Sequence, residues 1–539
     1  MPAMVNRLLR NIRFEFERDR TDSYLCRWLF LRLLGIVYLI AFVSLWTQID
    51  GLAGHNGILP VVDYLEAVRE RIGAERYWRL PTFCWLDTGD GFLHFQCAAG
   101  TVLSLLLIVG IAPVPALVFL WAIYLSLSTV CRDFLSFQWD ILLLETGFLA
   151  IFLAPRQWLA NFSRESAPSV IVLWLCRWLL FRLMFMSGAV KLLSADRAWW
   201  DLSALTFHYE TQPLPTWVGW YAHQLPVWFQ KSCVAILFVI ELAVPFLVFC
   251  GRRARQIAGV AFVLLMLLIS LTGNYCFFNL ITVTLCVLLW DDALLFRSVP
   301  GPLAAFMRTR VGAANGSADL RSGNPPAAPR TGSGRRPALL SPASREVVRS
   351  VGVGMLAAVI LLVSGTETAV RLFRVRNLPP PLLELLELVS SLRTVNSYGL
   401  FAVMTTTRPE IVVEGSNDGV RWLPYDFKWK PGRLDRTPPF VAPHQPRLDW
   451  QMWFAALGDY RGNPWFLNFL VRLLQGSPAV LALLEKNPFP DRPPRQVRAV
   501  LYEYHFTDFA ARQATGEWWR RERKGLYCPE ISLRQNKGD

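Results

Sequence analysis

The chain has 539 residues, of which 53% are hydrophobic and 18% are charged, and its net charge is +14. Soluble domains average about 25% charged residues, so this composition excludes an ordinary soluble enzyme. A positive net charge is also common in nucleic-acid-binding proteins, but here the basic residues lie in loops beside long apolar runs. Membrane topology accounts for that placement, so we expect contact with membrane lipid and no nucleic-acid partner.

Long apolar stretches along the chain predict a polytopic membrane protein. A helix needs roughly 20 apolar residues to cross a bilayer. Nine stretches meet or approach this length, at 28–46, 93–109, 113–130, 137–154, 169–193, 232–250, 256–272, 275–290 and 349–366. We therefore predict an all-α polytopic bundle in residues 1–290, completed by a last transmembrane helix at 349–372.

Basic residues beside these stretches predict the orientation of the bundle. Six arginines between Arg7 and Arg27 precede or open the first span, which places the N-terminus in the cytoplasm. Nine alternating spans then put the GRRAR loop at 251–255 on the cytoplasmic side and export the C-terminal region. Residues 291–348 are rich in Gly, Pro, Ala, Ser and Arg, which predicts a disordered basic cytoplasmic linker.

Residues 380–530 predict a compact α+β domain outside the membrane. Strands are expected at 398–404, 409–415, 420–427 and 495–506, and helices at 447–457, 464–474 and 478–485. Asn417-Asp418-Gly419 is typical of a tight turn between strands. The histidines of this domain, His444 and His505, lack zinc-type spacing or a Ser-His-Asp order, so we expect neither a metal site nor a hydrolase.

The cysteines predict no disulfide framework, because the chain has ten of them and no CxxC pair. Most lie inside the apolar runs. One alternative stays open, which is that Cys84 and Cys528 pair in an oxidising compartment.

Lys191 is the first candidate for chemistry, since it lies at the end of the apolar run 169–193. A cation at bilayer depth costs on the order of 2.5–3.5 kcal/mol on insertion scales. The segment FHYETQPLP at Phe207–Pro215 follows it, so His208 and Glu210 are the nearby catalytic candidates. Lys191 would act as a base or as an anchor for an anion. Alternatively, its side chain extends to the outer interface.

Other polar residues are predicted to lie inside the membrane. Asp140 and Glu145 are five positions apart and do not share a helix face, so they are no general acid–base pair. Asp140 is expected near the outer interface. Glu145 is expected deeper and paired, most simply with Arg182 or Lys191, although a catalytic role is the alternative. The remaining members of this group are Arg177 and Asn274.

Several motifs occur in an order that resembles the lipase maturation factor family. They are GHNGILP (54–60), FQWDILLLETGFLA (137–150), SGAVKL (187–192), LTFHYETQPLPTW (205–217), GNYCFFNL (273–280), NSYGLFAVMTTTRPEIVVEGSNDG (396–419), and then PPF, RLDWQMWFAAL, NPWF, YHFT and GEWW. The resemblance implies a protein that helps secreted lipases fold and assemble, in the endoplasmic reticulum membrane of eukaryotic relatives. Arginine and proline usage favours a bacterial chain, whose corresponding compartment is the plasma membrane.

Residues 1–290 also resemble the membrane region of the vitamin K-dependent carboxylases (the HTTM superfamily), through G-x-x-K-L at Gly188–Leu192 and a following tryptophan. That resemblance implies that a lysine in the place of Lys191 is a catalytic base.

Three functions remain open from the sequence. The preferred one is a chaperone-like folding factor, whose exported domain at 380–530 binds client polypeptides while the membrane region holds a lipid-like or quinone-like ligand. The second is a membrane enzyme that uses Lys191 as base, with His208 and Glu210. The third is a transporter, for which the helix break at Gly273–Asn274 is the signal. The sequence identifies no cofactor.

Overall fold

The computed structural model of the chain describes residues 19, 23–159, 167–298, 342–375 and 377–533. Residues 299–341, which form most of the predicted linker, lie outside the described residues. Within the described part, seven helices are long and apolar enough to cross a membrane. They are α2 (Tyr24–Trp46), α6 (Asp90–Val109), α7 (Pro113–Val130), α9 (Val170–Leu193), the stretch Val227–Phe249 that begins with α13 (Val227–Phe238), α14 (Arg252–Thr272), and Ser350–Phe373 within α18 (Pro342–Phe373).

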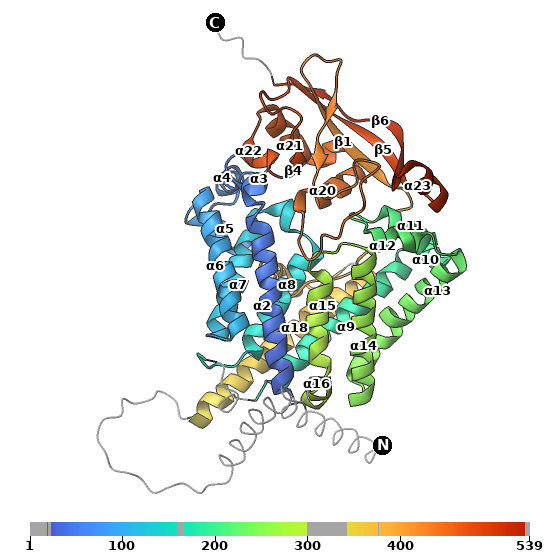
Figure 1. The fold of residues 1–539 in the computed structure, drawn as a ribbon. Coiled ribbons are helices and arrows are strands. Elements are labelled where there is room, and N and C mark those ends of the chain that lie inside the picture. Colours follow the sequence, from blue (N-terminus) through green and yellow to red (C-terminus); the bar gives the residue numbers. More distant parts are fainter. Residues whose placement is uncertain (1–18, 20–22, 160–166, 299–341, 376, 534–539) are drawn as a thin grey trace, which may run out of the picture.

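The other two predicted spans are present as shorter helices inside the bundle. They are α8 (Gln138–Leu153) and α15 (Phe278–Cys286), and a further turn extends α15 to Leu289. Both run alongside the long helices (Figure 1). Most of their residues are buried, so protein rather than lipid surrounds them. The predicted polytopic bundle with a C-terminal α+β domain is confirmed.

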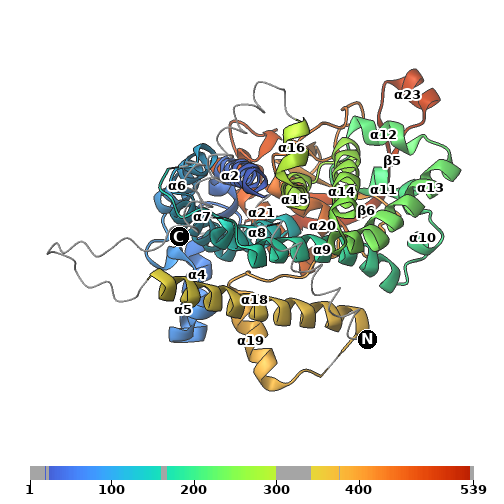
Figure 2. The same cartoon turned by 90° about the horizontal axis from the view of Figure 1, so that it is seen from below.

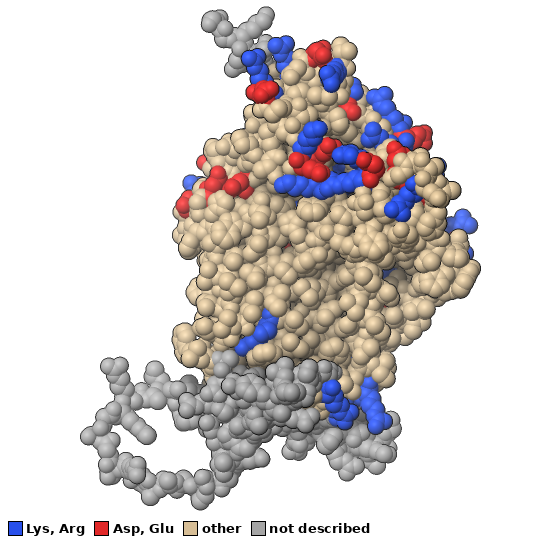
Figure 3. Space-filling view, in the orientation of Figure 1, with Lys and Arg blue, Asp and Glu red and all other residues tan. Residues whose placement is uncertain are grey.

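The outer surface of the bundle is apolar, as a bilayer requires. Helix α14 alone exposes Leu264, Leu267, Leu268 and Leu271. In Figure 3 a broad band across the middle of the molecule is almost free of charged residues, whereas charges of both signs gather on the C-terminal domain above it. This band marks the part of the molecule that contacts lipid.

Short helices cover the end of the bundle that faces the C-terminal domain. One group follows α2 and the other follows α9 (Figure 1). The first group is α3 (Ile49–Ala53), α4 (Val61–Ile72) and α5 (Arg76–Arg79), and the second is α10 (Arg197–Trp200), α11 (Ala204–Thr211) and α12 (Trp217–His223). A further helix, α16 (Asp292–Ser298), lies at the opposite end of the bundle. The polar loops of the sequence therefore form a platform beneath the C-terminal domain.

The C-terminal domain contains a four-stranded antiparallel sheet of order β2-β1-β5-β6 and a two-stranded sheet of β3 and β4. The strands are β1 (Pro409–Ser416), β2 (Leu423–Pro424), β3 (Asp426–Phe427), β4 (Leu484–Lys486), β5 (Gln496–Phe506) and β6 (Trp519–Ile531). Its helices are α20 (Arg447–Ala456), α21 (Pro464–Leu474), α22 (Pro478–Leu481) and α23 (Phe509–Thr515). Alternating residues of β1, including Ile411 and Val413, face the core.

Two strand predictions differ from the structure, and two strands of the structure were not predicted. Residues 398–404 form no strand, because their backbone bonds to the bundle instead, for example from Gly399 N to Gln138 Oε1 and from Met404 N to Asp196. The predicted strand at 420–427 is divided between β2 and β3, which belong to different sheets. Strands β4 and β6 were not predicted. The helix predicted at 478–485 ends at Leu481 as α22, and β4 begins at Leu484. The turn at 417–419 is present, and Gly419 has a φ of +73° there, which glycine accepts without strain.

All ten cysteines are unbonded, so the alternative that Cys84 and Cys528 pair is wrong. Both are buried, in different parts of the molecule. Cys84 Sγ accepts a hydrogen bond from Gln96 Nε2 at the platform end of the bundle. Cys528 lies in β6 opposite Ala499 of β5.

Candidate functional site

Asp140 joins the bundle to the C-terminal domain. The Arg447 guanidinium, at the start of α20, donates to both oxygens of the Asp140 carboxylate at 3.1 and 3.2 Å. Tyr124 donates its hydroxyl to the same carboxylate. Both charged side chains are fully buried. Asp140 therefore lies at the predicted end of its helix, but α20 covers it and water does not solvate it.

Glu145 makes the second link between the two parts. It pairs with Arg182, one of the two partners expected from the sequence. The same carboxylate accepts hydrogen bonds from the Asn396 backbone N–H at 2.8 Å and from the Tyr398 hydroxyl at 2.8 Å. Arg182 in turn donates to the Asn396 carbonyl. The NSYG motif is therefore inserted into the bundle, where it hydrogen-bonds to both members of this buried ion pair.

Asn274 makes the third link, at the break between α14 and α15. Its amide donates to the carbonyl of Pro439 at 2.8 Å, and its carbonyl oxygen accepts from the backbone N–H groups of Val441 and Ala442 at 2.7 and 3.0 Å. The helix break that raised the transporter alternative therefore binds a loop of the C-terminal domain.

Glu210 makes the fourth link. Its carboxylate accepts from the Phe506 backbone N–H at 2.9 Å and lies 3.5 Å from His505 Nδ1. Buried Arg408 donates to the carbonyl of Glu210 at 2.6 Å and to the Glu410 carboxylate at 2.7 Å. We call Asp140, Glu145, Glu210 and Asn274, with the C-terminal groups that bind them, the docking surface.

Lys191 lies just below the platform and is part of a separate ion pair. Its ammonium donates to both oxygens of Glu241, at 2.9 and 2.7 Å, and to the carbonyl of Ser187 at 3.0 Å. Glu241 is on the π-helical turn that follows α13. An ammonium has three hydrogens and no acceptor, so these bonds use its whole capacity. In this arrangement Glu241 and Ser187 occupy the Lys191 ammonium.

The three predicted catalytic residues do not share one set of hydrogen bonds. His208 bonds to the Tyr275 hydroxyl at 3.0 Å, while Lys191 bonds to Glu241 and Glu210 to Phe506. Burial and the neighbouring charge of Lys191 lower the pKa of His208 to about 4. Arg177 lies at the other end of α9, where it binds Asp19.

Some of these partners were missed from the sequence. Glu241 had a usable signal, because it is the one acidic residue between Val227 and Phe249 and an acid at membrane depth requires a partner. Arg408 and Arg447 had no such signal, because the neighbouring residues in the sequence do not distinguish them from the other arginines of the C-terminal domain.

His444 is a titratable group that joins the C-terminal domain to α2. Its Nδ1 lies 2.9 Å from the Ser44 hydroxyl of α2. Burial, with the charges of Arg447 and Lys428, lowers the pKa of His444 from 6.5 to about 4. Between about pH 4 and 6.5 the ring is therefore neutral in the folded chain and protonated in the unfolded chain. Stability from this group is present above about pH 6.5 and is lost as the pH falls toward 4.

We expect the thermal midpoint of the purified chain to decrease across this pH interval. His444→Gln removes the titrating group but keeps a polar side chain opposite Ser44, so its midpoint should depend less on pH. Midpoints measured between pH 7 and 4 for both proteins test this. Parallel curves would rule out the role of His444.

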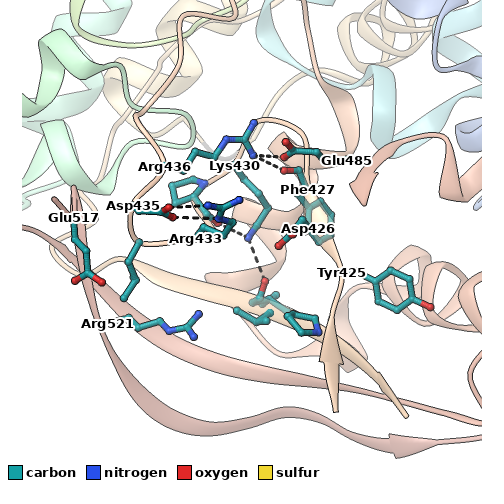
Figure 4. A pocket seen from close by; sticks show the side chains of 16 residues that line it. Tyr425, Asp426, Phe427, Lys430, Arg433, Asp435, Arg436, Glu485, Glu517 and Arg521 are labelled. Atoms are coloured by element: carbon teal, nitrogen blue, oxygen red, sulfur yellow. Dashed lines mark hydrogen bonds and ion pairs between the residues drawn. The ribbon is translucent and has the colours of Figure 1, made fainter. Parts of the chain in front are cut away.

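The C-terminal domain has a pocket of about 320 Å³ on the side of its sheet (Figure 4). Apolar residues line part of the pocket, among them Ile411, Phe427 and Leu434. Charged side chains of both signs surround them. They are Asp426, Lys430, Arg433, Asp435, Arg436, Glu485, Glu517 and Arg521. Such a mixture of apolar and charged surface can bind a polypeptide segment.

Four of these charges form two ion pairs within the pocket, and three charges, Asp426, Glu517 and Arg521, have no ion-pair partner among the described residues. Arg433 pairs with Asp435 at 2.7 Å and Arg436 with Glu485 at 2.6 Å. Among the described residues, neither Asp426 nor Glu517 has an ion-pair partner. The pocket therefore offers free carboxylates at its edge.

Comparison with known proteins assigns the chain to a family. The model of the lipase maturation factor transmembrane domain matches residues 25–297, and that of the lipase maturation factor C-terminal domain matches residues 394–529. Human lipase maturation factor 2 is 39% identical, with 95% of this chain and 83% of the relative covered. For human lipase maturation factor 1 the values are 36%, 95% and 88%. No solved structure matches. The chain belongs to the lipase maturation factor family.

Proposed function

We propose that the chain is a membrane-anchored folding factor for secreted lipases. The names of its relatives support this function. The structural observation that carries it is the docking surface, because buried polar contacts fix an extramembrane domain with an open pocket onto a membrane platform. A rigidly mounted pocket suits a protein that holds an unfinished chain at the membrane as it emerges.

We further propose that the N-terminus is cytoplasmic and the C-terminal domain is exported. The arginine-rich loops support this orientation by the positive-inside rule. Lysine and arginine side chains are also visible at the end of the bundle opposite the C-terminal domain (Figure 3). In a bacterium the membrane would be the plasma membrane, and the client would meet the pocket after export.

The pocket of the C-terminal domain is the proposed client-binding site. Its charged and apolar lining suits an extended segment that carries both kinds of side chain. Arg433 and Asp435 are well suited for a test, since both are exposed, at 66% and 57% of the side-chain surface. An exposed ion pair contributes at most about 1 kcal/mol to stability, so its removal leaves the fold intact.

The double variant Arg433→Ala/Asp435→Ala should bind its client about tenfold more weakly, which is ~1.4 kcal/mol. The yield of active lipase from cells that co-express the full chain should fall accordingly. Arg197→Ala/Asp201→Ala is the matched control, because it removes an exposed ion pair of α10 outside the pocket. Equal yields from the two variants at equal membrane abundance would reject the pocket as the client site.

Point variants are a sharper test than deletion of residues 380–539. Deletion would remove the ion-pair partner of buried Asp140 and the groups of Asn396 and Tyr398 that donate hydrogen bonds to buried Glu145. The bundle itself would then be damaged, and loss of lipase would not identify the client site.

A further inference from the structure

A second pocket, of about 850 Å³, opens at the side of the bundle and lies between the platform and the lipid-facing surface. It is formed by α5, α7, α8 and α19 (Pro380–Ser391). Its apolar lining includes Leu125 near the end of α7, and Ile141 and Leu144 near the start of α8. These ends of the helices meet the platform, so the lining reaches from the hydrocarbon into the headgroup region.

Helix α19 indicates what surrounds the pocket. It follows the last span and lies outside the bundle near α5 (Figure 2). It contains five leucines, yet none of its residues is buried, and Leu383 and Leu388 are more than half exposed. Trp78 of α5 is exposed as well. Exposed leucines and a tryptophan at this level are typical of a helix that lies in the membrane interface.

The edge of the pocket carries charges that have no ion-pair partner among the described residues. Arg132 and Arg393 are both exposed, and neither has a carboxylate within ion-pair distance among the described residues. The Arg132 guanidinium makes a cation–π contact with the ring of Tyr64. Glu384 and Asp133 line the same edge and, within the described part of the chain, are likewise without a basic partner. Arginines bind phosphate well, and the carboxylates can bind an ammonium.

We propose that this pocket holds one phospholipid of the adjacent leaflet whose headgroup carries both a phosphate and a primary ammonium. The acyl chains lie against Leu125, Ile141 and Leu144. Arg132 and Arg393 bind the phosphate, and Glu384 and Asp133 bind the ammonium. The volume falls within the 300–1,000 Å³ of small-molecule sites and admits part of one lipid rather than a layer of them.

A weak contact joins α5 to α19 at the edge of the pocket. Arg79 of α5 lies 3.4 Å from Glu387 of α19, and both side chains are more than half exposed. Such a pair contributes at most about 1 kcal/mol. A lipid can therefore enter sideways from the bilayer by separating α19 from α5.

Photo-crosslinking in nanodiscs tests the proposal with the full chain. The probe is phosphatidylethanolamine with a diazirine in one acyl chain, at a few per cent in phosphatidylcholine. We expect crosslinks to concentrate on peptides from 125–144 and 384–393. Arg132→Gln/Arg393→Gln should reduce them about fivefold or more, and Ile141→Trp, which fills the apolar lining, should reduce them similarly. Arg461→Gln, an exposed change outside the pocket, should not.

Two results would overturn the site. One is an even spread of crosslinks that includes the lipid-facing surface of α14 and does not respond to the arginine variant, which would mean ordinary surrounding lipid. The other is that unlabelled phosphatidylglycerol, which lacks the ammonium, competes with the probe as well as unlabelled phosphatidylethanolamine does. Neither result depends on whether the chain acts on lipases, because the readout is lipid contact alone.

Discussion

Asp140→Asn is expected to destabilise the folded chain by about 3–5 kcal/mol, because it leaves the buried guanidinium of Arg447 without its counter-charge. The side chain keeps its size, so the loss comes from charge and not from a cavity. The measurement is the thermal midpoint of the purified protein, together with the rate at which trypsin releases the C-terminal domain. Docking through Asp140 predicts a lower midpoint and faster release.

Asp435→Asn is the matched control, since it makes the same Asp-to-Asn change in an exposed ion pair of the C-terminal domain. Its effect should be at most about 1 kcal/mol. Replacing both buried partners, as Asp140→Leu/Arg447→Met, should restore part of the lost stability, because no charge remains buried and unpaired. Similar midpoints for Asp140→Asn and Asp435→Asn would show that the buried pair does not hold the domain.

Lys191→Met is expected to cost a comparable amount, about 3–5 kcal/mol, because the carboxylate of Glu241 then lies buried without a cation. The double variant Lys191→Met/Glu241→Leu should recover most of that loss and should support lipase maturation at the level of the unchanged chain. The two readouts are the thermal midpoint and the yield of active lipase.

The same pair of variants separates an ion pair from a catalytic lysine. A base cannot be replaced by methionine, so an enzyme would stay inactive in the double variant even with its stability restored. A stable, membrane-inserted double variant that yields no active lipase would therefore refute the structural role of Lys191.

The sequence predicted the spans well because each depends on local composition. It also predicted that Glu145 pairs with Arg182 or Lys191, since a carboxylate inside the membrane requires a partner, and the structure pairs it with Arg182. The sequence did not predict the partner of Asp140. Arg447 is 307 positions away in another domain, and a single sequence carries no signal for a contact over that separation.

The C-terminal strands show the same limit. Strand β1 alternates buried and partly exposed residues, so its pattern was recognisable. Strand β6 contains the run Arg520–Lys524, which is exposed throughout. The sequence therefore shows no alternation of buried and exposed residues there, and only the pairing with β5 identifies the strand. Residues 398–404 have the composition of a strand, but they are apolar because they contact the bundle.

These observations give the family motifs a physical meaning. The QWD, ETG, HYETQP and GNY segments of the membrane region, and the NSYG, PPF and RLDW segments of the C-terminal domain, meet at the docking surface. In the structure these segments hold the C-terminal domain against the bundle. The chemistry that Lys191 raised from the sequence is not needed for that attachment.

Site-specific crosslinking to the client tests this account most directly. A photoreactive phenylalanine analogue would replace Arg433 in the pocket or, as the control, Arg197 on α10, in cells that export a lipase. The account predicts a covalent adduct between the full chain and the lipase from position 433, and little from position 197. Equal or absent adducts at both positions, in cells whose lipase maturation still requires the chain, would contradict it.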